Sequence, residues 1–236
     1  MKIVKEFSRF ADEYDTYNVI QKEVAKKLIG YVEKRKYSTI LDLGSGDGAV
    51  YNALVEREIQ FDNFVALDFS KEMLALHPSA HNVTKICMDF NESDLSSVIK
   101  KSEVDIVISS SALQWSRDID ATLSSISSLS SGAYLSFFTA NTFKTLHKTA
   151  NIISPIYSKS EILEALDRLF IYECETVEYK LNFNSVHKML RYIKHSGVNG
   201  GVKQLGFREI KQLMEKYPLN YLEFEVIFVK VRGRKR

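Results

Sequence analysis

The chain has almost no net charge, and this absence excludes one broad class of function. Its 236 residues include 32 basic and 30 acidic side chains, which give a net charge of +2. Such a balance does not indicate a protein that binds nucleic acid through the phosphate backbone. The dense basic run at 232–236 is expected to be a solvated terminus, with contact to a polyanion as the alternative.

Long apolar runs and a targeting segment are also lacking. No apolar stretch approaches the roughly 20 residues that a membrane-spanning helix needs, so no membrane partner is expected. Charged residues such as Lys2, Lys5 and Glu6 interrupt the start of the chain, which therefore does not resemble a signal peptide. We expect a cytoplasmic protein.

Cysteine and metal-ligand patterns are sparse. Cys87 and Cys174 are far apart and neither has the neighbours of a metal site, so both are expected to be buried free thiols in a reducing compartment. His187 and His195 are separated by eight positions and do not share the i, i+4 helix face of a metal pair. No metal site is predicted.

What the sequence does contain is a regular alternation of short apolar runs and amphipathic segments. Strands are expected at 39–43, 63–67, 83–87, 104–109 and 133–139, with helices between them at 48–57, 71–76, 94–100 and 118–129. This alternation of strands and helices predicts βαβ units and a parallel sheet with helices on both faces. The serine-rich stretch 109–131 is read as a strand end and a helix, because apolar residues still mark one helical face.

The remaining segments complete a single α/β domain. A helix is expected at 18–35, within an N-terminal arm of about 1–36, and further helices at 143–151, 159–168, 185–195 and 207–216. A long strand at 169–183, bent near Glu175, and a last strand at 221–231 bring the sheet to seven strands. The last strand is expected to lie antiparallel beside the fifth. Cap elements are expected at about 143–168 and 184–206, inserted after strand five.

The most informative stretch is ILDLGSGDGAV at 40–50, which is followed by VALD at 65–68. It predicts a strand ending in Asp42, a turn containing Gly44 and Gly46, a helix, and a second strand ending in Asp68. Glycine lets the backbone approach a ligand, and a carboxylate at the tip of the second strand can accept hydrogen bonds from two ribose hydroxyls. The pattern therefore predicts a nucleoside site at the carboxyl ends of the strands.

The residue before the glycines distinguishes two nucleoside cofactors. Spacing alone does not exclude NAD, because the third glycine of GxGxxG is replaced by the tolerated Ala49. Asp42 would repel a pyrophosphate, whereas it can accept from an ammonium group. The loop resembles motif I of the class I S-adenosylmethionine (SAM) methyltransferases, E/D-x-G-x-G-x-G. That resemblance implies a Rossmann-like fold and places Asp42 near the methionine ammonium and the glycine backbone near its carboxylate.

Four further residues are candidates for the adenine end of the cofactor. Asp89, just after the third strand, can accept from the exocyclic amine, while the backbone N–H of Phe90 can meet a ring nitrogen; a helix N-terminal acid is the alternative for Asp89. Phe69 and Met73 are placed to cover the base, although either can equally belong to the core.

The segment after the fourth strand reads SSSALQW. It lacks the N/D-P-P-Y/F motif of methyltransferases that act on bases or glutamine amides, so nucleobase N-methylation is not expected. Gln114 and Trp115 offer an amide and a large apolar face at the mouth of the pocket, where a substrate would contact them.

Several segments resemble the BioC enzymes, the malonyl-thioester O-methyltransferases of biotin synthesis. The opening FSRFADEYDTYNVIQ is similar to that family's N-terminal pattern, with Asn18 in place of the usual alanine. ALQW at 112–115 resembles its strand-four segment, and YLEFEVIFVKV its final strand. The cap signature F-x(7)-R-x-x-K-x-x-G is matched by Phe183, Arg191, Lys194 and Gly197.

This resemblance implies a substrate and a mechanism. The substrate would be a malonyl thioester on acyl carrier protein or CoA, whose free carboxylate is ionised at pH 7 and needs no general base. Arg191 would pair with that carboxylate, Phe183 would contact the substrate, and Tyr14 would close over the cofactor. Two alternatives stay open, a carboxyl methyltransferase for another small acid such as trans-aconitate, and a SAM-binding protein without catalysis.

Overall fold

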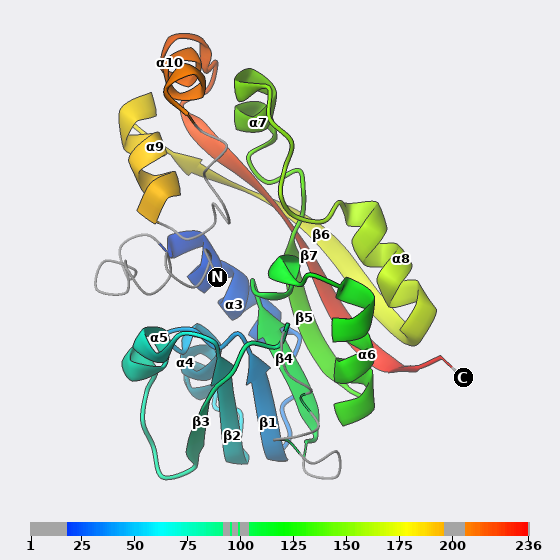
Figure 1. Ribbon diagram of the computed structural model, residues 1–236. Helices are drawn as coiled ribbons and strands as arrows, with labels where there is room; N and C mark the ends of the chain where they lie inside the picture. The colour runs from blue at the N-terminus through cyan, green and yellow to red at the C-terminus, as the bar shows by residue number, and fades with distance from the viewer. Residues whose placement is uncertain (1–17, 92–94, 96–98, 100–103, 196–205, 236) are drawn as a thin grey trace.

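The computed structural model describes residues 18–91, 95, 99, 104–195 and 206–235, and these form one sheet covered by helices (Figure 1). The seven strands lie in the order β3-β2-β1-β4-β5-β7-β6. β7 runs antiparallel to both of its neighbours, and the remaining pairs are parallel, so the predicted fold class is confirmed. The strand bounds are β1 (Tyr37–Leu43), β2 (Phe61–Asp68), β3 (Val83–Cys87), β4 (Ile106–Ser110), β5 (Ala133–Phe138), β6 (Phe170–Asn182) and β7 (Tyr221–Arg234).

The helices agree closely with the sequence pattern, except near the N-terminus. There the predicted helix 18–35 ends at Gly30, because the residues at 33–36 are all charged and exposed and have no apolar face to bury. The predicted helix 94–100 lies largely outside the described residues. The helix bounds are α3 (Val19–Gly30), α4 (Ala49–Glu56), α5 (Lys71–Leu76), η4 (Leu113–Trp115), α6 (Ile119–Leu129), α7 (Lys144–Ala150), α8 (Lys159–Leu169), α9 (Val186–His195) and α10 (Phe207–Lys216).

Two apolar layers hold the helices to the faces of the sheet. On one face α3 and α4 bury side chains such as Leu28 and Leu54 against the central strands. On the other face α6 and α8 pack together, with Leu123 and Leu166 fully buried. The serine-rich helix is thereby confirmed, because its apolar stripe is inside and serines such as Ser128 are exposed. None of the described helices is long and apolar enough to cross a membrane.

The edge strands correct two expectations. Cys87 and Cys174 are both exposed, so the prediction of buried thiols is wrong. They lie on β3 and β6, the two outermost strands, which the helical layers cover incompletely. The irregularity in β6 falls between Ile171 and Tyr172 and not near Glu175.

The β6–β7 ribbon extends beyond the rest of the sheet and supports the cap helices. β5 pairs with β7 only as far as Phe138↔Val226, whereas β6 continues beside β7 to Asn182↔Tyr221. The helices α7, α9 and α10 lie at this projecting end, past the carboxyl ends of β1, β2 and β4 (Figure 1). α8 packs instead with α6 on the sheet, so the segments expected to form the cap divide between two places.

Candidate cofactor site

The glycine loop between β1 and α4 is held against the end of β2. The amides of Gly44 and Ser45 both donate to the Leu67 carbonyl, at 2.8 and 3.0 Å. Gly44 and Gly48 adopt φ values of +73° and +93°, which side chains rarely adopt. A Cβ at Gly44 would also stand 2.3 Å from Cβ of Ala112, so this position of the loop admits only glycine.

Asp68 connects the glycine loop to the start of α5. Its two carboxylate oxygens accept hydrogen bonds from the backbone N–H groups of Gly46 and Ser70, both at 2.9 Å. Burial raises the pKa of this carboxyl group, and the two backbone donors partly oppose the shift. Each oxygen can accept a second hydrogen bond, so Asp68 remains able to receive donors from a ligand.

Asp42 is the most unusual group in the site. It is fully buried at the end of β1, and within the described part of the chain neither carboxylate oxygen has a hydrogen-bond donor. Burial, and then the nearby charge of Asp68, raise the pKa of Asp42 well above its ordinary value. A buried carboxylate with no donor is costly. A cationic donor bound beside Asp42 would remove that cost, and this is the strongest indication of a ligand.

Other polar atoms around the loop lie buried in the same way. The hydroxyl of Ser45 has no hydrogen-bond partner among the described residues, and neither has the side-chain oxygen of Asn18. The Asn18 amide donates to Asp47 of the glycine loop at 2.9 Å, so this residue ties the start of α3 to the loop. The sequence identifies Asn18 only as a departure from the BioC pattern and does not predict its hydrogen bond with Asp47.

The loops after β3 and β4 are joined by Asn91. Its side-chain oxygen accepts from the backbone N–H of Arg117 at 2.8 Å, and its amide donates to the carbonyl of Trp115 at 3.5 Å. One oxygen of Asp89 accepts from the Asn91 backbone at 2.8 Å, within a turn that follows β3. The proposed hydrogen bond from the adenine amine to the other carboxylate oxygen of Asp89 stays a prediction. No sequence pattern predicts this role of Asn91.

The predicted apolar and amide residues of the site differ in exposure. Met73 is buried, with Cε 3.6 Å from the position that a Cβ would take at Gly46, whereas Phe69 and Phe90 are half-buried. Gln114 in η4 is also buried; its amide donates to the carbonyl of Ser111 at 2.6 Å, and its oxygen has no partner among the described residues. Trp115, which follows it, is half-buried.

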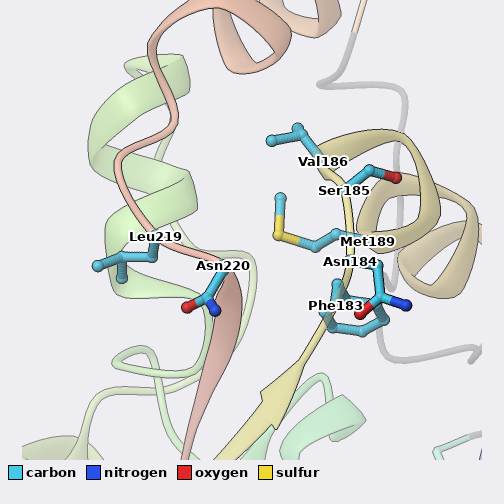
Figure 2. Close-up of a pocket in the computed structure, with 7 residues that line it drawn as sticks. All are labelled: Phe183, Asn184, Ser185, Val186, Met189, Leu219 and Asn220. Carbon is cyan, nitrogen blue, oxygen red and sulfur yellow. The ribbon is translucent and has the colours of Figure 1, made fainter.

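The predicted substrate residues of the cap lie on different elements from the glycine loop. Phe183 follows β6 and lines a pocket of about 120 Å³ together with Met189 of α9 and Leu219 before β7 (Figure 2). Arg191 is exposed on α9, two positions beyond the buried Met189 and on the opposite face of that helix. Tyr14 and Gly197 lie outside the described residues. Within the described part, no cluster of three or more possible metal ligands is found.

Sequence comparison relates the part of the chain that contains the site to a methyltransferase domain family. The pattern of a methyltransferase domain family matches residues 41–132, which contain the glycine loop, Asp68 and η4. A malonyl-[acyl-carrier protein] O-methyltransferase of Calditerrivibrio nitroreducens is 26% identical over 89% of this chain and 85% of its own length. A protein of the same name from Bacillus cytotoxicus is 31% identical over 61% of this chain, and that match spans 52% of the relative's length.

Solved structures show the same fold at low sequence identity. In the complex of the Haloferax volcanii Trm112 methyltransferase activator with a putative methyltransferase, one chain superposes with a TM-score of 0.66 at 17% identity, with 99% of both chains covered. A phosphoethanolamine N-methyltransferase of Haemonchus contortus, solved with S-adenosylhomocysteine, has a TM-score of 0.55 at 16% identity and covers 91% of this chain and 53% of its own. The chain therefore has the fold of these methyltransferases, contains a segment that matches a methyltransferase domain family, and is similar in sequence to the malonyl-[acyl-carrier protein] O-methyltransferases.

Proposed function

We propose that this protein binds SAM and transfers its methyl group to the free carboxylate of a malonyl thioester, an early step of biotin synthesis. The observation that carries the proposal is the buried carboxylate of Asp42, which has no donor among the described residues and lies before the glycine loop. The methionine end of SAM carries an ammonium group of the required charge. The names of the two relatives support the malonyl substrate.

Each part of SAM has a matching group in the site. Asp42 would accept from the ammonium, the backbone of the glycine loop would lie near the methionine carboxylate, and Asp68 would accept from the ribose hydroxyls in addition to its two backbone bonds. The half-buried Phe69 and Phe90 would contact the adenine. When bound, SAM supplies a methyl group activated by the sulfonium.

The chain's own contribution to the reaction is positioning. A malonyl carboxylate is already an ionised nucleophile at neutral pH, so no side chain has to remove a proton. Arg191 would neutralise that carboxylate during entry, because its planar guanidinium matches the two oxygens. Gln114, Trp115 and Phe183 would border the acyl portion and help to exclude water.

The choice of cofactor is directly testable by calorimetry. We expect the protein to bind SAM and S-adenosylhomocysteine and not NAD, because Asp42 attracts an ammonium and repels a pyrophosphate. Titrations of the purified protein with each of the three compounds would measure this. Binding of NAD in the absence of any binding of SAM would overturn the proposed function.

The chemical step should show little dependence on pH. At saturating SAM, the single-turnover rate is expected to be flat from about pH 6 to pH 8, which is above the ordinary pKa of the substrate carboxyl group. A quenched-flow series with a malonyl thioester would measure the rate. A bell-shaped profile centred near neutral pH would contradict this and would direct attention to a histidine such as His187 on α9.

A substrate panel separates the proposal from its two rivals. Incubation with methyl-labelled SAM, malonyl thioesters, trans-aconitate and other small acids should give a labelled ester only with the malonyl compounds. Preference for trans-aconitate would identify a different carboxyl methyltransferase, and binding of SAM without any product would identify a non-catalytic binding protein. Comparing malonyl-CoA with malonyl-acyl carrier protein would show which thioester arm is used.

A further inference from the structure

The cap helix α10 has an exposed apolar stripe. Phe207, Ile210 and Met214 are 87%, 42% and 47% exposed, and their spacing of three and four residues places them on one face of the helix. A different face anchors the helix: Leu213 is fully buried, and the Gln212 amide donates to the Thr149 carbonyl of α7 at 2.7 Å. The stripe is therefore not the face that holds α10 to the protein.

The three cap helices at this end of the molecule are strongly basic, although the chain as a whole is nearly neutral. The sequences of α7, α9 and α10 together contain eight Lys and Arg residues and two Glu residues, a net charge of +6, whereas the whole chain has +2 and the remainder therefore −4. Two of the eight lie near acids, Lys144 with Glu178 at 3.4 Å and Lys211 with Glu215 at 3.9 Å. Lys188, Arg208 and Lys216 are exposed on the same helices.

We propose that the stripe Phe207, Ile210 and Met214, with the basic residues around it, is the docking surface for an acidic carrier protein that delivers the malonyl thioester. This inference rests on the proposed function and specifies its partner. An apolar centre surrounded by charge is the usual composition of a protein–protein interface, and the charge selects a partner of opposite sign. The cap stands past the carboxyl ends of the parallel strands, so a protein docked there would lie at the same end of the sheet as the glycine loop (Figure 1).

The same charge disfavours a second copy of this chain as the occupant. A symmetric dimer through α10 would bring two caps of net charge +6 together, and like charges across an interface are unfavourable. Exposed Phe207 also differs from a scattered surface residue, because two further apolar side chains continue its face of the helix.

The test compares two substrates that differ only in the size of the thioester arm. Phe207→Glu should lower kcat/KM for malonyl-acyl carrier protein about 10- to 30-fold, as expected for the centre of an interface, and leave kcat/KM for malonyl-CoA within about twofold. Val55→Glu on α4 is the matched control, since Val55 is 53% exposed and lies far from the cap in the sequence. Val55→Glu should leave kcat/KM for both substrates unchanged. Arg208→Glu should lower kcat/KM only for malonyl-acyl carrier protein, and the loss should be largest at low salt.

The possible outcomes separate the docking surface from the reaction. Equal loss with both substrates would show that α10 acts on the site itself, and no loss with either would show that the stripe is not used; either result overturns the proposal. If the wild-type protein methylates neither thioester, the proposed function fails, and docking is then decided by calorimetry with the carrier protein alone. If the carrier protein binds the wild type but not Phe207→Glu, the docking surface is supported. Equal binding to the two proteins overturns it.

Discussion

Replacing Asp42 with asparagine should weaken SAM binding by roughly 10²–10⁴-fold while making the ligand-free protein more stable. The loss of affinity follows because removing one partner of a buried ion pair costs about 3–5 kcal/mol, and each 1.36 kcal/mol is a factor of ten. The gain in stability follows because Asp42 is fully buried, has no donor among the described residues and is repelled by Asp68. An increase in melting temperature of about 2–4 °C is expected for each kcal/mol recovered.

The pH dependence provides a second measurement of the same residue. The folded-state pKa of Asp42 lies above its ordinary value of 3.8, so its contribution to stability is fully present below that value and is lost as pH rises through the raised pKa. The stability advantage of Asp42→Asn should therefore grow with pH. The affinity of the wild type for SAM should rise over the same range, because the ammonium pairs with the ionised carboxylate. Calorimetry and thermal unfolding between about pH 5 and pH 7 would measure both.

A control on the neighbouring strand shows whether the effect of Asp42→Asn is specific. Asp62 lies near the opposite end of β2 from Asp68, is exposed, and pairs with Lys36 at 2.7 Å. Asp62→Asn should leave SAM affinity unchanged, since an exposed ion pair contributes little. If Asp42→Asn bound SAM as tightly as the wild type, Asp42 would not hold the ammonium and the assignment of the site would be wrong.

Replacing Arg191 with alanine should reduce kcat/KM for malonyl thioesters by roughly 10²–10⁴-fold. A substrate carboxylate enclosed with the cofactor loses its water, and a buried charge without its partner is strongly destabilised. Arg191 is exposed on α9, while Met189 and Ile193 of that helix are buried, so truncation should not disturb the cap. SAM affinity should not change, because the residues proposed to hold SAM are elsewhere. Steady-state kinetics with malonyl-CoA and calorimetry with SAM would test both points.

Three comparisons make the role of Arg191 specific. Arg191→Lys should recover only part of the activity, because an ammonium cannot pair with both oxygens as a guanidinium does. Lys188→Ala on the same helix should have little effect with malonyl-CoA. A thioester whose terminal carboxylate is already methylated should bind wild type and Arg191→Ala about equally. Near-normal turnover by Arg191→Ala would show that this side chain belongs only to the surface.

The sequence by itself determined the order of the elements and the place of the cofactor loop. Parallel strands appear as apolar runs with helical segments between them, so β1, β2 and their glycine turn could be located within one or two residues. Gly44 and Asp68 could be named because glycine at positive φ and an acid at a strand end are local requirements, visible without the rest of the chain.

Only the tertiary structure decided which groups are buried and what they meet. Whether Cys87 and Cys174 are covered depends on their strands being at the edges of the sheet, and strand order is a long-range property. The hydrogen bond between Asn18 and Asp47 joins residues 29 positions apart. Asp42 is fully buried and has no donor among the described residues, which its place at the end of an apolar strand does not reveal. The exposed stripe of α10 also follows from which face of that helix the cap uses, because an amphipathic sequence does not specify how much of its apolar face will be covered.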